Sequence, residues 1–111
     1  MAGKPNPTKN RGNDSYIVYV IYKGNSANAD MSNVWKYGIS KVGESRAKSQ
    51  LPRCNGYLLP DSRGRGSCGY TVLHRDVPGK LAARQLERGY ISAYLGRYGH
   101  CPPGHRGRVC T

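Results

Sequence analysis

The longest apolar stretch of the chain is a run of β-branched and aromatic residues at positions 16–22. Such residues are enriched in strands, and a run without polar alternation is typical of a strand that is buried on both faces of a sheet. A polar, turn-rich segment at residues 23–33 interrupts the pattern. A second run follows at residues 34–40, so the two runs predict an antiparallel hairpin with a long loop.

Residues 45–51 predict a short helix that ends at Pro52, since proline lacks the amide hydrogen that a helix interior needs. The following residues, 52–69, are rich in glycine and carry Arg53, Arg63 and Arg65. A basic loop of this kind can lie against phosphate or can be an ordinary solvated loop, and the sequence favours neither interpretation.

The second half of the chain predicts a third strand at residues 70–74 and then the longest helix. Apolar residues at helical spacing from Leu81 onward support this helix. Asp76 is its expected N-cap, Pro78 suits its first turn, and Gly96 marks its expected end.

The two ends of the chain predict little regular structure. Residues 1–15 are polar and cannot bury enough apolar surface to offset the entropy of ordering, so they predict a flexible arm. Residues 97–111 are rich in glycine and proline and predict an irregular tail. We therefore expect one domain over residues 16–111 with a small α+β fold, a three-stranded antiparallel sheet flanked by helices.

The composition adds a strong positive charge. The chain has 111 residues, with 18 Lys and Arg against 6 Asp and Glu, and a formal net charge of +12. Such a charge attracts polyanions, so nucleic acid is the expected partner, and an acidic protein or a membrane surface is a weaker alternative. Between the nucleic acids, we expect DNA rather than RNA. No apolar run approaches the ~20 residues that span a bilayer, and no classical secretory signal is recognised. A monomer is the default expectation.

The four cysteines leave three states open. They are Cys54, Cys68, Cys101 and Cys110, and none shows the CxxC spacing of structural zinc sites. They can form two disulfides, which would imply an oxidising environment, or remain free thiols. They can also join His74, His100 or His105 in a zinc site.

Among the few acidic residues, Glu87 is the one in the middle of the predicted long helix, with Arg84 and Arg88 beside it. It can form an exposed pair with Arg84, worth only about 0.3 kcal/mol. A site that cleaves phosphodiesters needs an oxygen ligand for a hard divalent cation, and Glu87 is the leading candidate for that ligand.

Several of these residues occur in a familiar order. The segments Ile17-Val18-Tyr19 and Lys36-Tyr37-Gly38-Ile39-Ser40 are followed by Arg46, eight residues after Gly38, and by Glu87 on the helix after the third strand. This order resembles the GIY-YIG nuclease superfamily over residues 16–106. Tyr19 stands for the tyrosine of the first motif and Gly38 for the glycine of the second. Arg46 and Glu87 stand for the helical arginine and the metal-binding glutamate of the family.

Four positions depart from the family pattern. Ile17 replaces the glycine of the first motif, and Lys36 replaces the tyrosine of the second, a change that some branches of the superfamily share. Gln50 stands where a histidine or tyrosine is often found, and His105 stands in place of an asparagine that follows a proline-containing turn.

The resemblance implies a metal-dependent endonuclease. Glu87 would hold one Mg²⁺ or Mn²⁺, and Arg46 would bind phosphate oxygens through its planar guanidinium. Tyr19 would position or deprotonate the attacking water with help from Lys36, because nearby cations lower the pKa of a phenol.

Two histidines complete the candidate catalytic set. His74 would relay a proton from the end of the third strand, and His105 would take the last position of the family pattern. The candidate nucleic-acid-binding residues are Arg53, Arg63, Arg65 and Arg106.

A small, strongly basic nuclease domain with a polar leading segment also resembles the C-terminal toxin module of a bacterial polymorphic or contact-dependent toxin. This implies cleavage with little sequence specificity, non-classical delivery into the cytoplasm of a target cell, and inhibition by an acidic immunity protein. Two alternatives stay open. One is a non-catalytic basic nucleic-acid-binding module, which would not need Glu87. The other is a secreted, disulfide-stapled basic protein.

Overall fold

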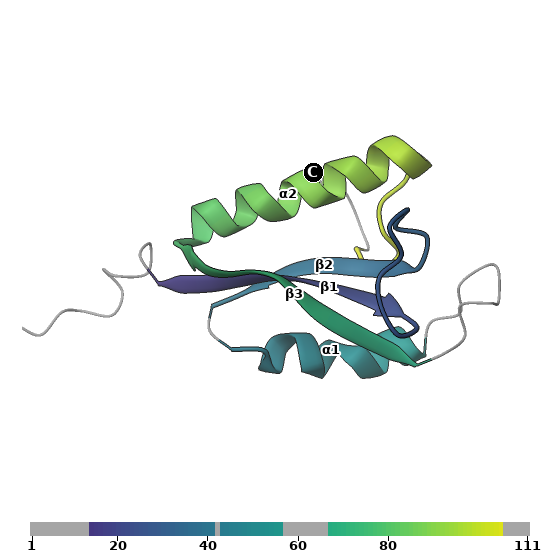
Figure 1. The fold of residues 1–111 in the computed structure, drawn as a ribbon, viewed down its shortest axis with the longest axis horizontal. Coiled ribbons are helices and arrows are strands. Elements are labelled where there is room, and N and C mark those ends of the chain that lie inside the picture. Colours follow the sequence, from purple (N-terminus) through teal and green to yellow (C-terminus); the bar gives the residue numbers. More distant parts are fainter. Residues whose placement is uncertain (1–13, 42, 57–66, 106–111) are drawn as a thin grey trace, which may run out of the picture.

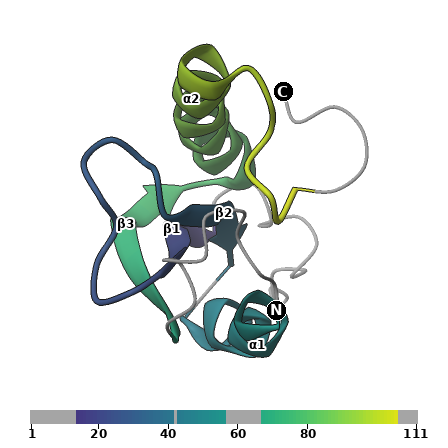
Figure 2. The ribbon, with the colours of Figure 1, turned by 90° about the vertical axis from the view of Figure 1, so that its right-hand side faces the viewer.

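The computed structural model describes residues 14–41, 43–56 and 67–105. Its elements are β1 (Ser15–Lys23), β2 (Val34–Ser40), α1 (Ser45–Asn55), β3 (Cys68–Pro78) and α2 (Lys80–Tyr98). The strands form one antiparallel sheet in the order β2-β1-β3, with α1 against one face and α2 against the other (Figure 1 and Figure 2). The α+β fold predicted from the sequence is therefore confirmed.

Strand β1 lies in the centre of the sheet and is buried on both faces. Ile17, Tyr19 and Ile21 pack in a cluster with residues of α1. Val18, Val20 and Tyr22 pack in the clusters that include residues of α2. Because each face of β1 is covered by a different helix, its sequence has no polar alternation. Strand β2 has the bounds that the sequence predicts.

Helix α1 continues through Pro52, so the predicted end at this residue is wrong. An internal proline removes a helical hydrogen bond and costs about 3 kcal/mol, so other contacts must hold the last turn. Cys54, in that turn, is fully buried and forms a disulfide with Cys68 at the start of β3. The side chain of Asn55 also accepts a hydrogen bond from the backbone N–H of Cys68 at 2.7 Å.

The disulfide decides among the three cysteine states that the sequence left open. Cys101 is disulfide-bonded as well, and no free cysteine is found among the described residues. Cys110 lies outside them. Two distant segments, the end of α1 and the start of β3, are thus joined covalently.

Helix α2 begins later than the sequence predicts, with Gly79 rather than Asp76 at its N-cap. The reason is that β3 runs on to Pro78, which pairs with Ser15 at the start of β1. The backbone N–H of Gly79 then donates to the carbonyl of Asp14 at 2.8 Å. Asp14 and Ser15 therefore belong to the folded domain, although the sequence places them in the flexible arm.

The end of α2 also differs from the prediction. The helix passes Gly96 and ends at Tyr98, where Gly99 adopts a left-handed conformation with φ of 76° and its N–H bonds to the carbonyl of Leu95. A glycine within an exposed helix costs only about 1 kcal/mol relative to alanine, so Gly96 does not end the helix. No helix in the described part of the chain is long and apolar enough to cross a membrane.

Candidate functional site

The pairing of β1 with β2 places Tyr19 opposite Gly38. The tyrosine ring lies against the glycine: a Cβ atom at position 38 would stand 2.5 Å from both Cζ and the hydroxyl oxygen of Tyr19. Real Cβ atoms essentially never approach other atoms so closely. Position 38 must therefore be glycine if Tyr19 is to lie in this place.

Helix α1 holds the other end of the Tyr19 side chain. The Tyr19 hydroxyl donates a hydrogen bond of 2.9 Å to the side-chain oxygen of Gln50. Burial raises the pKa of the Tyr19 phenol, and the positive charge of Arg46 opposes this rise without cancelling it. Arg46, and not Lys36 as expected from the sequence, is thus the cation that lowers the pKa of Tyr19, and desolvation is the larger effect. Tyr19 is a neutral phenol at neutral pH, with its proton directed at Gln50.

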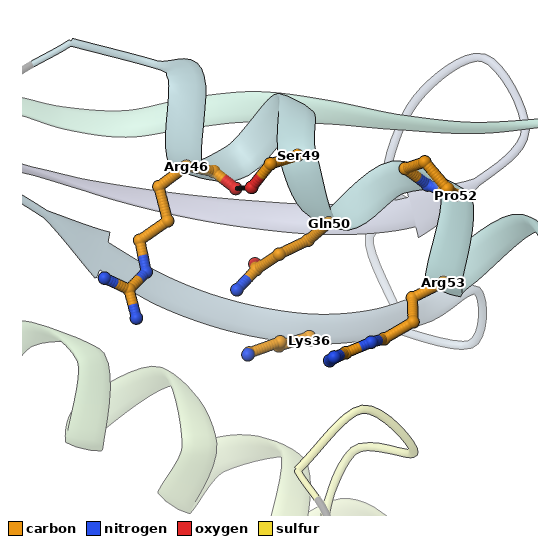
Figure 3. A pocket seen from close by; sticks show the side chains of 6 residues that line it. All are labelled: Lys36, Arg46, Ser49, Gln50, Pro52 and Arg53. Atoms are coloured by element: carbon orange, nitrogen blue, oxygen red, sulfur yellow. Dashed lines mark hydrogen bonds between the residues drawn. The ribbon is translucent and has the colours of Figure 1, made fainter.

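One face of α1 forms the wall of an open pocket beside Tyr19. Arg46, Ser49, Gln50 and Arg53 share this face because they are spaced three to four residues apart. With Pro52 and with Lys36 of β2, they line a space of about 710 Å³ (Figure 3). The described lining thus has three cationic side chains and no acidic one. Such a lining suits an anion, and a guanidinium is well matched to phosphate oxygens.

Lys36 interacts electrostatically with charged side chains of both helices. It is half-buried, and burial lowers the pKa of its ammonium group. The positive charges of Arg46 and Arg53 lower that pKa further, whereas the carboxylate of Glu87 raises it. Lys36 is therefore within electrostatic reach of both helices, α1 with its arginines and α2 with Glu87.

Glu87 comes to the site from α2. It is half-buried, and burial raises the pKa of its carboxyl group, with Arg84, Lys36 and Arg88 acting in the opposite direction. The two ion pairs within the described residues, Lys41–Asp14 and Arg75–Glu44, do not include it. The exposed Glu87–Arg84 ion pair considered from the sequence is thus not formed.

A divalent metal fits this site in one particular way. Among residues 14–41, 43–56 and 67–105, no three His, Cys, Asp or Glu side chains gather, so the zinc site considered from the sequence is not found there. Mg²⁺, however, is commonly held by one or two carboxylates, with waters and substrate phosphates completing its shell. Glu87 suits that arrangement, because its carboxylate is partly desolvated and no ion pair within the described part of the chain includes it.

The structure does not bring His74 to the pocket. His74 pairs with Val18, on the sheet face that α2 covers, whereas Tyr19 faces α1. Its Nε2 atom lies 2.8 Å from the hydroxyl of Tyr90, whose ring stacks on Tyr37 with centroids 5.3 Å apart. In this structure His74 is part of the packing between the sheet and α2.

His105 is near the site but is engaged with the backbone. Its Nε2 atom accepts a hydrogen bond from the N–H of Tyr37 at 3.1 Å, and the N–H of Gly104 donates to the carbonyl of Trp35 at 2.6 Å. These two bonds satisfy outward-facing groups of the edge strand β2. Burial, together with the charge of Lys36, lowers the pKa of His105 to about 4, as suits an imidazole that accepts through Nε2.

The candidate nucleic-acid-binding residues divide into two groups. Arg53 lines the pocket, but from helix α1 rather than from a loop. Arg63, Arg65 and Arg106 lie outside the described residues. Gln50 stands out in the sequence only as a departure from the family pattern, and Ser49 carries no such signal. The spacing of Arg46, Gln50 and Arg53 would have placed them on one face if the helix had been extended through Pro52.

Comparison of the chain with protein-family models, with curated proteins and with solved structures finds no match. The resemblance to GIY-YIG nucleases therefore rests on the order of residues in the sequence. The structural evidence that bears on function is the cationic pocket lined by Lys36 and Arg46. Tyr19 is bonded to Gln50 in the wall of this pocket, and Glu87 lies within electrostatic reach of Lys36.

Proposed function

We propose that this chain is a divalent-metal-dependent endonuclease that hydrolyses phosphodiester bonds of DNA or RNA with little sequence specificity. The observation that carries the proposal is the electrostatic coupling among four side chains from four elements, beside a pocket with a cationic lining. They are Tyr19, Lys36, Arg46 and Glu87. Hydrolysis needs a bound phosphate, an oriented water and stabilisation of the charge that develops on the phosphoryl oxygens.

Phosphate binding falls to Arg46 and Lys36. The guanidinium of Arg46 presents paired N–H donors that match two phosphate oxygens, and Lys36 adds a point charge from the opposite wall. The ammonium group of Lys36 is half-buried, and electrostatic interactions are stronger in such a partly desolvated place than in bulk water. Arg46 and Lys36 therefore also stabilise negative charge that accumulates on the phosphoryl oxygens during the reaction.

Tyr19 orients the attacking water. Its proton is directed at Gln50, and the oxygen accepts a side-chain hydrogen bond from Arg46, so its second lone pair can accept a hydrogen bond from a water molecule. Its raised pKa favours this positioning role over removal of a proton by a phenolate. From the sequence, Tyr19 could either position or deprotonate the attacking water, and here it positions the water.

Glu87 is the residue that would hold Mg²⁺ or Mn²⁺. A bound divalent ion would polarise the phosphate and ease departure of the leaving oxygen. Glu87 is partly buried and has no ion-pair partner among the described residues, which leaves its carboxylate available for this interaction. The half-buried ammonium of Lys36 also balances part of its charge when no metal is bound.

A role as a toxin domain is part of the proposal. The net charge of +12 suits a domain that binds nucleic acid through phosphates, and an acidic immunity protein would be its electrostatic complement. The Cys54–Cys68 disulfide is of the kind that forms in oxidising compartments, as in proteins exported from the cell. Delivery into the cytoplasm of a target cell would then expose the domain to DNA.

The test is incubation of the purified protein with supercoiled plasmid and, separately, with total RNA. Each substrate is treated with Mg²⁺, with Mn²⁺ and with EDTA, and the products are separated on gels. Cleavage that requires the metal supports the proposal and shows which nucleic acid is cut. Binding of either substrate without cleavage in any metal would contradict it and would favour a non-catalytic binding module.

A further inference from the structure

The cationic side chains of the pocket extend over two turns of helix α1. Arg46 and Arg53 are seven residues apart, which corresponds to about 10 Å of helical rise on nearly the same face. Figure 3 shows their guanidinium groups on either side of the Lys36 ammonium. Both arginines also influence the pKa of Lys36, so each lies within electrostatic reach of it. The positive charge forms a row rather than a single point.

The position of Glu87 makes the two ends of this row unequal. The carboxylate of Glu87 raises the pKa of both Tyr19 and Lys36, and the charge of Arg46 lowers the pKa of both. Arg53 lowers the pKa of Lys36 but does not change that of Tyr19. The Arg46 end of the pocket is therefore the end with the candidate catalytic groups, and the Arg53 end is the more distant one.

A single phosphodiester carries one negative charge, and a phosphate held by Arg46 and Lys36 would leave Arg53 without a partner. A nucleic-acid strand offers one phosphate per nucleotide, so a neighbouring phosphate can meet the far end of the row. Arg53 is exposed, which leaves its guanidinium open to such a ligand.

We propose that the pocket is a two-phosphate site, in which Arg46 and Lys36 bind the phosphate to be cleaved and Arg53 binds an adjacent phosphate of the same strand. This inference rests on the proposed function in taking a nucleic-acid strand as the ligand. The preferred substrates of such a site are strands with at least two consecutive phosphodiesters. Arg53 determines that preference by strengthening binding and takes no part in hydrolysis.

The test measures the binding of thymidine oligonucleotides in EDTA, where no cleavage occurs. A dinucleotide has one internal phosphodiester and a trinucleotide has two. The trinucleotide should bind about tenfold more tightly, well above the twofold gain expected from its two binding registers. A trinucleotide with one uncharged methylphosphonate linkage, which keeps the third base but removes a charge, should bind like the dinucleotide.

Substitution then assigns the second phosphate to Arg53. Arg53→Gln should remove the advantage of the trinucleotide and leave dinucleotide binding unchanged, while Arg53→Lys should retain part of the advantage. The dependence of affinity on salt should also flatten, by a slope of about 0.7 for one lost phosphate contact on a single strand. Lys48→Gln is the matched control, because Lys48 is exposed on the same helix outside the pocket and should change none of these values.

Two outcomes would overturn the two-phosphate site: a trinucleotide that gains no more than twofold over the dinucleotide, or Arg53→Gln weakening both ligands equally. Because these measurements use no metal, they are independent of hydrolysis. If the trinucleotide preference is found but no metal supports cleavage, the nuclease function fails and the two-phosphate site stands. If cleavage occurs without the trinucleotide preference, the nuclease function stands and the two-phosphate site fails.

Discussion

The ring of Tyr19 occupies the space that a side chain at Gly38 would need, with its hydroxyl oxygen 2.5 Å from the position of a Cβ atom there. The two residues are direct partners across β1 and β2, so neither can move away without distorting the ladder. The glycine therefore allows a buried tyrosine to reach from the central strand to Gln50, which lines the pocket.

Replacement of this glycine should displace Tyr19. We expect Gly38→Ala to lower the free energy of unfolding by about 1–3 kcal/mol, the usual cost of overpacking, and to reduce cleavage strongly. Denaturant unfolding and a cleavage assay measure the two effects. In a Tyr19→Val background the clash is absent, so the same alanine should have little effect on stability. Equal costs in both backgrounds would show that the contact with Tyr19 is not the reason for the glycine.

The hydroxyl of Tyr19 should matter for cleavage more than for stability. Tyr19→Phe keeps the ring against Gly38 and removes the bond to Gln50, so unfolding should change by about 1 kcal/mol. Cleavage should fall about 10²-fold or more, because the water loses its partner. Tyr22→Phe is the matched control. Tyr22 lies on the same strand and also bonds through its hydroxyl, to Thr71 and to the carbonyl of Tyr70.

Tyr22→Phe should lose a similar amount of stability and keep full cleavage. The role given to Tyr19 is refuted if the two variants cleave equally well. Both unfolding curves and initial cleavage rates are needed, because a drop in activity that follows a drop in folded protein would carry no information on the site.

His105 should make the protein less stable in mild acid. Its pKa falls from 6.5 in the unfolded chain to about 4 in the folded one, so between these values the unfolded chain binds a proton that the folded chain does not. The contribution of His105 is therefore complete above pH 6.5 and is lost as the pH falls toward 4. Because the side chain is partly exposed, the loss should be about 2 kcal/mol.

The measurement is the free energy of unfolding of the wild type and of His105→Gln from pH 4 to 7.5. The glutamine oxygen can accept the same bond from Tyr37 but does not titrate, so the difference between the two curves isolates the histidine. Parallel curves would mean that His105 does not hold the edge of β2 as a neutral acceptor.

The Cys54–Cys68 disulfide should stabilise the fold substantially. The two cysteines are 14 residues apart, and for a loop of this size removal of the bridge costs about 2–4 kcal/mol. Thermal unfolding of the Cys54→Ala/Cys68→Ala variant measures this cost. Thiol titration of the denatured wild type without reductant should label neither cysteine. Reactive Cys54 or Cys68 in that titration would contradict the bridge and restore free thiols as the state of this pair.

The elements that the sequence predicted correctly are those in which local pattern and tertiary placement agree. The apolar run that forms β1 is buried on both faces, and β2 follows it as a hairpin. The errors arise where distant contacts decide. Helix α1 passes Pro52 with its last turn held by a disulfide to β3, and α2 starts late because β3 pairs with the first residues of β1.

The same distinction applies to the candidate site. Residue order was enough to select Tyr19, Lys36, Arg46 and Glu87. In the structure, Arg46 and Glu87 each lie within electrostatic reach of both Tyr19 and Lys36. That these residues catalyse hydrolysis stays a prediction. Their protonation could not be read from the sequence, because burial of the Tyr19 phenol depends on packing from α1 and β2. The partnership of Gln50 with Tyr19 likewise joins two elements that are distant in the chain.

Glu87→Gln tests most directly whether Glu87 serves metal-dependent hydrolysis. The change removes one charge and keeps the size of the side chain. Asp30→Asn is the matched control, since Asp30 is exposed in a loop and its carboxylate accepts a bond from the N–H of Ser32. Cleavage is measured with Mg²⁺, and binding of the same DNA or RNA is measured in EDTA.

We expect Glu87→Gln to cleave about 10³-fold more slowly than the wild type, in line with the several kcal/mol that a Lewis-acid metal supplies. Its binding in EDTA should be unchanged or slightly tighter, and Asp30→Asn should cleave like the wild type. If Glu87→Gln retains full metal-dependent cleavage, the site proposed around Glu87 is not the active site.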